Sequence, residues 1–340
     1  MKLDISYIIR NEETLWKSIR WEDTPTCKCG CKEVYSTGDN RYKCKECGYT
    51  FSDTSNTLLQ NSKLPKWKWL FAIYTLSAQR GVSVRELASL IGVSRSTSWL
   101  MLHKIRSYMS LDSVDLSGVV CMDEAHIGGW SGMHFNKKME FMREHHFLPE
   151  GKKYTKAQIL AASSEKKQHI LCAVNSEGKA KVFHIKGQIT KDIIRQVVKK
   201  NGITHIISDE SPLYRGIKGV SVEQSNHSKH VFMTEGGHTS NPCENRFSWV
   251  KRILTTYHTH SNDKYLQLYL NQIIFKINYS HLSVEDRFLK LGRLCCSKYM
   301  THSEALEDSF EYKEEPDFEK ILKDFGGLIV SIEHRHRTYK

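Results

Sequence analysis

No run of apolar residues in this 340-residue sequence is long enough to cross a lipid bilayer, which takes about 20 consecutive apolar residues. The first 20 residues do not form a secretory signal either, because Asp4, Arg10, Glu12 and Glu13 interrupt the apolar stretches. Internal repeats, low-complexity tracts and a coiled-coil seam are also missing. These absences argue against membrane and secreted classes and predict a cytoplasmic protein with no membrane partner.

The chain has ten cysteines but no secretory context in which they would form a disulfide framework. Five of them fall between Cys27 and Cys47, and the others are spread over the rest of the sequence. Clustering of this kind in a reduced compartment indicates a metal site.

Acidic residues are in the minority, with 38 Asp and Glu against 50 Lys and Arg, for a net charge of +12. The excess favours a polyanionic partner such as nucleic acid, although a basic, well-solvated surface is the plainer explanation. An acidic stretch at 304–319 leaves the basic charge concentrated before it. A chain of this length with 39% hydrophobic residues allows two or three domains.

The cysteine cluster predicts a structural zinc ribbon at 21–60, after a short N-terminal helix within 1–20. Too few apolar residues lie in 21–60 for an ordinary core, so a bound ion would hold the segment together. Cys44 and Cys47 have the two-residue gap of a zinc knuckle. Cys27, Cys29 and Cys31 offer gaps of one or three residues, so any two of these three would complete a four-thiolate Zn²⁺ site.

Residues 61–112 predict a helix-turn-helix. Ser83 followed by Glu86 is a capping box, Gly92 supplies a left-handed turn, and Ser94 caps the second helix. An ordinary helical hairpin is the alternative, but the positive charge and the neighbouring ribbon favour DNA binding. On the second helix we expect Arg95, Ser96 and Ser98 to face outward, toward a major groove. The positions expected to face inward are Leu87, Ala88, Ile91, Val93 and Leu100.

The character of the sequence changes to α/β over residues 113–280. Residues 130–156 read as a basic, aromatic insertion, and we expect its Lys137 and Lys138 to contact DNA. A helical and acidic tail follows over 281–340. Strands are predicted at 117–122, 157–163, 168–174, 180–185, 204–208 and 220–224, and helices at 191–200, 242–256 and 263–277.

Three carboxylates are placed to converge in this domain. Asp123 and Asp209 each end an apolar run that reads as a buried strand, and Glu244 opens a helix. Converging carboxylates are a natural site for two divalent cations that cut or join phosphodiesters. Taken singly, an Asp after a strand is most often a turn or cap residue, so the prediction depends on the ordered set.

Basic and amide side chains accompany the third acid. Lys251 lies two helical turns after Glu244 and would contact a phosphate near the metals. Arg252 is a further candidate for DNA binding, although both cations also suit a solvated helix face. His238 and Asn241, just before Glu244, would orient substrate or a ligand.

The segments 122–129, 208–210 and 241–252 resemble the DDE transposases of bacterial insertion sequences. The most similar subgroup is the ISXO2-like one, which carries an N-terminal zinc ribbon and is related to the eukaryotic Merlin elements. The resemblance covers roughly residues 21–280. This chain departs from the family in the first cysteine group, where relatives usually have a two-residue gap.

The resemblance implies a multidomain fold with a ribonuclease-H-like (retroviral-integrase-like) catalytic core. It implies Asp123, Asp209 and Glu244 as ligands of two Mg²⁺ or Mn²⁺ ions, with Lys251 as the family's lysine. Some relatives carry Asn as the third ligand, which makes Asn245 or Asn241 the alternative to Glu244.

The expected function is that of a transposase that binds the inverted repeats of its element. It would expose a 3′-hydroxyl at each end and join it to target DNA, acting as a nucleoid-associated homo-oligomer with no small-molecule substrate. A catalytically silent zinc-ribbon DNA-binding protein and a ribonuclease-H-fold nuclease are the alternatives.

Overall fold

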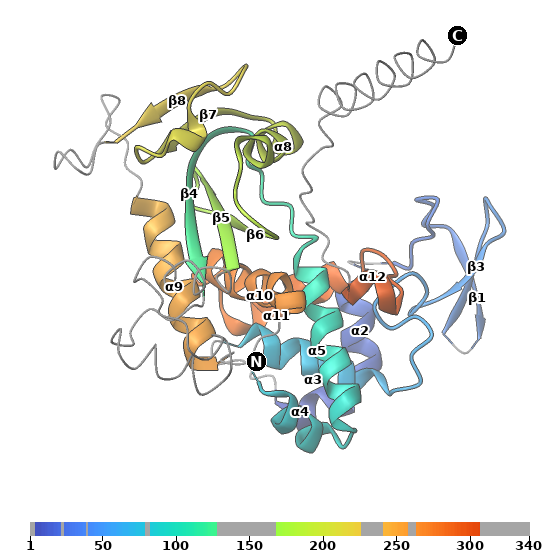
Figure 1. The fold of residues 1–340 in the computed structure, drawn as a ribbon. Helices are drawn as coiled ribbons and strands as arrows, with labels where there is room; N and C mark the ends of the chain where they lie inside the picture. The colour runs from blue at the N-terminus through green and yellow to red at the C-terminus, as the bar shows by residue number, and fades with distance from the viewer. Residues whose placement is uncertain are drawn as a thin grey trace, which may run out of the picture.

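The computed structural model describes residues 4–21, 24–38, 40–78, 82–127, 168–225, 241–257 and 263–306 (Figure 1). Three parts can be followed in the view: a small sheet on the right, a group of helices at the bottom, and a larger sheet with helices around it. No helix in the described ranges is long and apolar enough to span a bilayer.

The small sheet is antiparallel, in the order β1 (Val34–Gly38), β2 (Arg41–Cys44), β3 (Thr50–Ser52). All three strands lie within the segment 21–60. Trp21, Tyr42 and Phe51 form its aromatic centre, with the rings of Trp21 and Tyr42 5.3 Å apart. This is a small core, as the composition of the segment requires.

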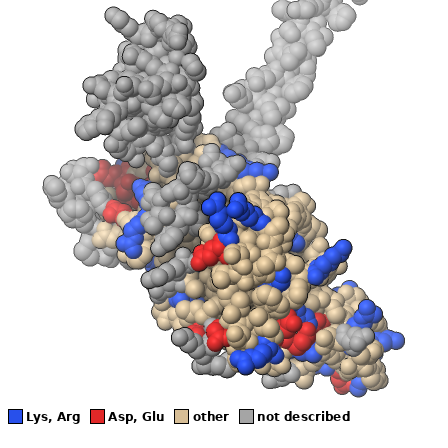
Figure 2. Space-filling view, turned by 90° about the horizontal axis from the view of Figure 1, so that it is seen from below, with Lys and Arg blue, Asp and Glu red and all other residues tan. Residues whose placement is uncertain are grey.

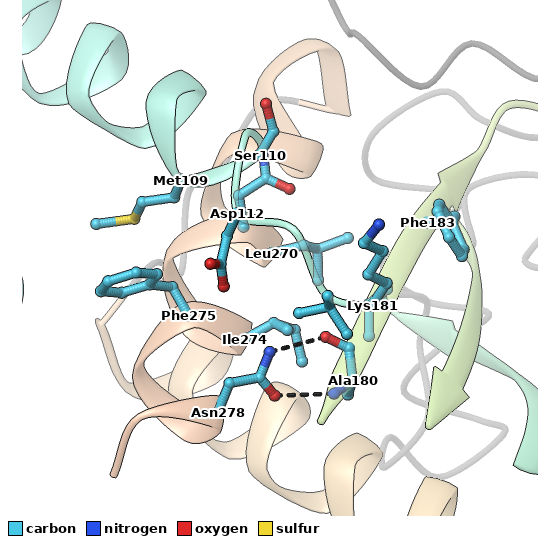
Figure 3. Close-up of a pocket in the computed structure, with 13 residues that line it drawn as sticks. Met109, Ser110, Asp112, Ala180, Lys181, Phe183, Leu270, Ile274, Phe275 and Asn278 are labelled. Atoms are coloured by element: carbon cyan, nitrogen blue, oxygen red, sulfur yellow. Dashed lines mark hydrogen bonds between the residues drawn. The ribbon is translucent and has the colours of Figure 1, made fainter. Parts of the chain in front are cut away.

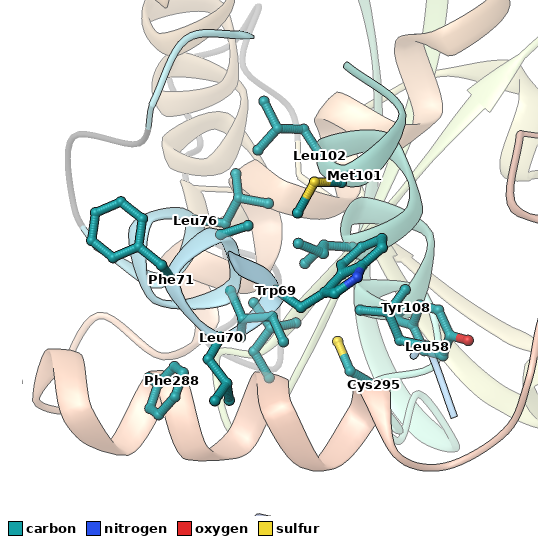
Figure 4. Close-up of a cluster of buried hydrophobic side chains, with 14 of the residues drawn as sticks. Leu58, Trp69, Leu70, Phe71, Leu76, Met101, Leu102, Tyr108, Phe288 and Cys295 are labelled. Carbon is teal, nitrogen blue, oxygen red and sulfur yellow. The ribbon is translucent and has the colours of Figure 1, made fainter. Parts of the chain in front are cut away.

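The helical part is built around one hydrophobic cluster that draws on both ends of the chain (Figure 4). Ile8 and Trp16 from the first helices and Phe288 and Cys295 from the last are all fully buried in it. The described part of 281–340 therefore packs into the helical core. The helices are α1 (Ile5–Arg10), α2 (Glu12–Arg20), α3 (Lys66–Ser77), α4 (Val84–Ile91), α5 (Arg95–Met109), α11 (Val284–Cys295) and α12 (His302–Leu306).

Helices α4 and α5 are joined by the predicted tight turn. The Ser83 and Glu86 side chains form the capping box, and Gly92 has a φ of 60° in the left-handed region. The Ser94 hydroxyl accepts from the Thr97 N–H and caps α5. The expectation that Ser98 faces outward is wrong: its side chain is buried, and its hydroxyl donates to the Val84 carbonyl at 2.9 Å. Ser98 therefore ties the second helix to the start of the first.

The large sheet has five strands in the order β6-β5-β4-β7-β8, and only β5 runs antiparallel to the others. Helix α8 makes the crossover from β6 to β7. The predicted elements of this domain agree with those observed except that β4 runs to Ile127, beyond the predicted 117–122, and the predicted strand 157–163 lies outside the described residues. The elements are β4 (Gly118–Ile127), β5 (Gln168–Asn175), β6 (Ala180–Ile185), α8 (Lys191–Asn201), β7 (Ile203–Ser208), η1 (Pro212–Tyr214), β8 (Ser221–Gln224), α9 (Asn241–Tyr257), η3 (Asp263–Tyr265) and α10 (Leu266–Asn278).

Side chains of the central strand β4 alternate between two apolar layers. Val120 and Met122 pack in the layer that contains α8, whereas Cys121 and Ala125 pack in the layer that contains α9 and α10. Alternation along a strand therefore puts Asp123 on the α9 side of the sheet. Asp123 lies in the middle of β4, so the expectation that it ends its strand is wrong; β5 supports the strand as far as Ile127.

Helix α10 connects the sheet to the helical part. The Asn278 amide accepts from the Ala180 N–H and donates to its carbonyl, both at 2.9 Å (Figure 3). On the other side of α10, Arg106 of α5 donates to Gln272 at 2.7 Å. A small cavity of about 40 Å³, lined by Met109, Asp112, Lys181 and others, lies at this junction. It is too small for more than water, so we regard the junction as a structural contact.

Candidate active site and metal centre

The register of two parallel strands brings Asp123 and Asp209 to the same level. Cys121 of β4 is level with Ile207 of β7, and each Asp follows two residues later. Neighbouring strands lie about 4.8 Å apart, so two carboxylates sit side by side where β7 ends and β4 continues. The carboxyl end of the parallel strands is therefore acidic.

The loop after β7 is fixed by hydrogen bonds around Asp209. The Asp209 carboxylate accepts from the Ser211 N–H at 3.0 Å, which closes an Asx turn. The Gln224 side-chain amide donates to the main-chain carbonyls of Asp209 at 2.7 Å and Ser211 at 2.9 Å. Gln224 ends the edge strand β8, so the edge of the sheet holds the main chain at Asp209 in place.

Helix α9 carries Glu244 across this end of the sheet. The Cys243 thiol donates to the Cys121 carbonyl at 3.2 Å, which joins the first turn of α9 to β4. Arg246 donates to the Gly178 carbonyl at 2.7 Å, and Phe247 and Val250 are buried in the layer below. Glu244 follows Cys243 directly, and its side chain is exposed.

The electrostatics of Asp123 reflect the crowding of acids. Burial, followed by the negative charges of Asp209, Glu124 and Glu244, raises the pKa of the Asp123 carboxyl to about 7. The Glu124 N–H donates to the Asp123 carboxylate at 2.8 Å and offsets a part of this effect. A cluster of this kind retains a proton near neutral pH unless a cation balances it.

The donor set fits a divalent metal. Asp123, Asp209 and Glu244 offer hard carboxylate oxygens, which Mg²⁺ prefers, and a cation would relieve the repulsion that raises the Asp123 pKa. Glu124 is turned to the other face of the sheet. Its carboxylate accepts from Ser211 Oγ at 2.8 Å and Tyr214 Oη at 2.6 Å, so it supports the loop after β7.

The other predicted site residues lie on α9 or outside the described residues. Lys251 and Arg252 are exposed, and the Arg252 guanidinium lies 4.4 Å from the centre of the Trp249 ring. Asn241 begins α9, and Asn245 is exposed on it. The structure does not describe His238, Lys137 or Lys138, nor the insertion 130–156.

Sequence reasoning missed the residues that hold the acids in place. Ser211 was detectable, because a residue two positions after an Asp commonly closes an Asx turn. Gln224 and Cys243 gave no comparable signal, since their partners are distant in the sequence.

The cysteine cluster resolves into one set of four. The Sγ atoms of Cys27, Cys29, Cys44 and Cys47 all lie within 4.8 Å of one another, with 3.6 Å between Cys27 and Cys47 and between Cys29 and Cys44. Tetrahedral Zn–S bonds of about 2.3 Å place sulfurs about 3.8 Å apart, so the four thiols fit a zinc ion. Cys31 points to the Glu33 carbonyl instead, at 3.5 Å.

Backbone amides favour a thiolate in this cluster. The Cys47 N–H leads the interactions that lower the pKa of Cys44 to about 6. Thiolates are the form that binds zinc, so Cys44 is prepared for this role before an ion arrives.

Comparison with known families addresses the domain that contains the acids. Residues 115–278 match the model of the ISXO2-like transposase domain. The chain carries an ISXO2-like transposase domain. The matched residues run from just before β4 to the last residue of α10, so the domain includes the whole five-stranded sheet and the helix that carries Glu244.

The further likenesses include one curated protein and one solved structure. An uncharacterized protein in transposable element ISH50 of Halobacterium salinarum is 29% identical over 123 residues, which are 35% of this chain and 42% of that protein. The matching segment therefore spans less than half of the relative. A pre-cleavage Mos1 transpososome structure is 10% identical, covers 87% of this chain and 97% of its own, and gives a TM-score of 0.20. A TM-score of this size does not indicate a common arrangement.

Proposed function

We propose that this protein is an active transposase that cuts the ends of its element and joins them to target DNA. Residues Asp123, Asp209 and Glu244 would hold two Mg²⁺ or Mn²⁺ ions, which would supply an activated hydroxyl and stabilise the leaving oxygen. The observation that carries the proposal is the meeting of three acids at one end of the parallel strands, inside an ISXO2-like transposase domain.

The sheet supports this reading. Its five strands in chain order occupy the positions 3-2-1-4-5, and the second strand alone is antiparallel. This arrangement is the one expected of a ribonuclease-H-like core, with the acids on the first and fourth strands and on the helix that follows the sheet. Lys251 lies seven residues after Glu244 in the same unbroken helix, on the same side, where it would contact a phosphate.

DNA binding would fall to the N-terminal modules. Arg95 and Ser96 are exposed at the start of α5, the position at which the second helix of a helix-turn-helix meets bases. On the face seen in Figure 2, Lys and Arg side chains form separate groups with acids between them.

The test is metal-dependent cleavage of DNA that carries the sequences flanking the gene. We expect the wild-type protein to nick this DNA in Mg²⁺ and to join the cut end to a plasmid. Asp209→Asn should lower the rate at least about 100-fold, because loss of a ligand costs more than loss of its outer partners. Asp192→Asn, which removes an exposed acid paired with Arg195 on α8, should leave the rate unchanged.

Each other result would contradict the proposal in its own way. Full cleavage by Asp209→Asn would show that cleavage does not depend on the acidic site. Nicking without joining would indicate a nuclease, and binding without nicking a silent DNA-binding protein.

A further inference from the structure

An exposed tryptophan lies on the helix that carries Glu244. The Trp249 side chain is 42% exposed, whereas Phe247, Val250 and Leu254 of the same helix are 5% exposed or less. An indole left in water forgoes the free energy of burial, so its place on an otherwise polar surface calls for an explanation.

A cation holds the indole in place. Arg252, one turn later, lies with its guanidinium carbon 4.4 Å from the ring centre. Stacking on a guanidinium limits the rotation of the ring and covers one of its faces. The indole ring, with the guanidinium stacked on it, is called the platform below.

The platform lies further along the same helix as Glu244. Trp249 lies five residues after Glu244, about 7.5 Å along the helix axis and about 140° around it. The residues Asn245, Ser248, Lys251 and Arg252 on this side of α9 are all exposed, so one continuous polar face connects the carboxylate to the indole. Glu244 is the single acid in α9, and Lys251 and Arg252 make the rest of the face positive.

We propose that Trp249 is a nucleobase-stacking residue that holds one base unstacked from the duplex beside the phosphate at the acids. Aromatic rings and guanidinium planes stack with unpaired bases in proteins that bind single-stranded nucleic acid. The two cations favour a nucleic acid over a protein partner. This inference rests on the proposed function for the location of the phosphate, but the stacking itself does not require cleavage.

The experiment compares two duplexes bound by the full-length zinc-loaded protein, with Ca²⁺ in place of Mg²⁺. One duplex carries 2-aminopurine paired with thymine, and the other carries it opposite an abasic site, where it unstacks readily. We expect the wild type to bind the unpaired probe more tightly, by about 5- to 150-fold, and to quench its fluorescence. Trp249→Ala should bring this ratio close to one, and Trp249→Phe should retain most of it.

Ile9→Ala is the matched control, because Ile9 is 44% exposed, much like Trp249, but lies on α1, outside the ribbon and the pair α4 and α5. Its ratio should equal that of the wild type. If Trp249→Ala leaves the ratio of the two affinities unchanged, the inference is overturned. It is also overturned if this variant alters only self-association, which would indicate a protein interface. If Asp209→Asn cleaves normally while the ratio depends on Trp249, the proposed function fails and the stacking site stands. If the wild type binds neither duplex, both fail.

Discussion

At the scale of single residues, the position of Asp123 determines its chemistry. It lies in mid-strand, level with Asp209 and on the side of the sheet that α9 covers. The acids could be selected from the sequence because each follows an apolar run or opens a helix. The mid-strand position of Asp123 could not be predicted from the sequence. Pairing with β5 extends β4 beyond Asp123, and local sequence does not encode the pairing of two strands. The prediction that Ser98 faces outward was wrong for a similar reason, because only the contact with Val84 shows which way this side chain faces.

Asp123→Asn should stabilise the metal-free protein at high pH. The folded-state pKa of about 7 is above the ordinary 3.8, so the wild type loses stability as pH rises from about 4 to 7, while the variant does not. We expect the variant to be more stable by on the order of 2 kcal/mol at pH 8 and by much less at pH 5. Urea unfolding at both pH values measures this, in Mg²⁺-free buffer without a chelator, which would remove zinc.

Mg²⁺ provides the second half of that test. It should raise the stability of the wild type at pH 8 and have little effect on Asp123→Asn. A difference between the two proteins that is the same at both pH values would show that the carboxylate is not crowded.

At the scale of elements, the turn between α4 and α5 depends on the backbone of Gly92. An added Cβ there would meet no atom within 4 Å, so a substitution is penalised only by the left-handed φ of 60°. Gly92→Val should cost about 1–2 kcal/mol, and Gly92→Asn less, because Asn tolerates this conformation. Equal midpoints of urea unfolding for the two variants would contradict this account.

The ribbon gives a second test at this scale, because the sequence left its first two ligands open. Cys29→Ser should lose zinc, whereas Cys31→Ser should keep one ion per chain, since Cys31 points to the Glu33 carbonyl. Elemental analysis of the purified variants measures the zinc content. Retention of zinc by Cys29→Ser and its loss from Cys31→Ser would reverse the assignment.

At the scale of the whole molecule, α2 and α11 meet at one close contact. A Cβ on Gly292 would lie 2.7 Å from Ile19 Cγ2, and Ile19 is buried. Gly292→Ala should therefore destabilise the protein by about 1–3 kcal/mol through overpacking, although Ala is the better helix former by about 1 kcal/mol.

The effect of Gly292→Ala on stability should change sign when the Ile19 side chain is shortened. In an Ile19→Ala background, Gly292→Ala should become neutral or stabilising, because the clash is gone and the helix preference remains. Urea unfolding of the wild type, the two single variants and the double variant measures this double-mutant cycle. The same cost in both backgrounds would show that the two helices do not press on each other here.

The sequence predicted most of the sheet domain because its strands and helices have strong local periodicity. It did not reveal that residues 284–306 complete the core built by residues 66–109. The apolar side chains of α11 mark a buried face, but a buried face does not specify its partner. Long-range contacts such as that of Tyr108 with the Lys298 carbonyl, at 2.9 Å, are visible only in three dimensions.

Because α11 and α12 pack against the N-terminal helices, the helical core can be completed only late in translation. Domains fold as units while the ribosome works from the N-terminus, but the helical core lacks Phe288, Leu291 and Cys295 until the sheet domain has been translated. A chain interrupted before Val284 leaves the apolar faces of α3 and α5 uncovered. The finished support for α5 therefore becomes available only in a chain translated beyond α11, after every residue of the acidic site has already been made.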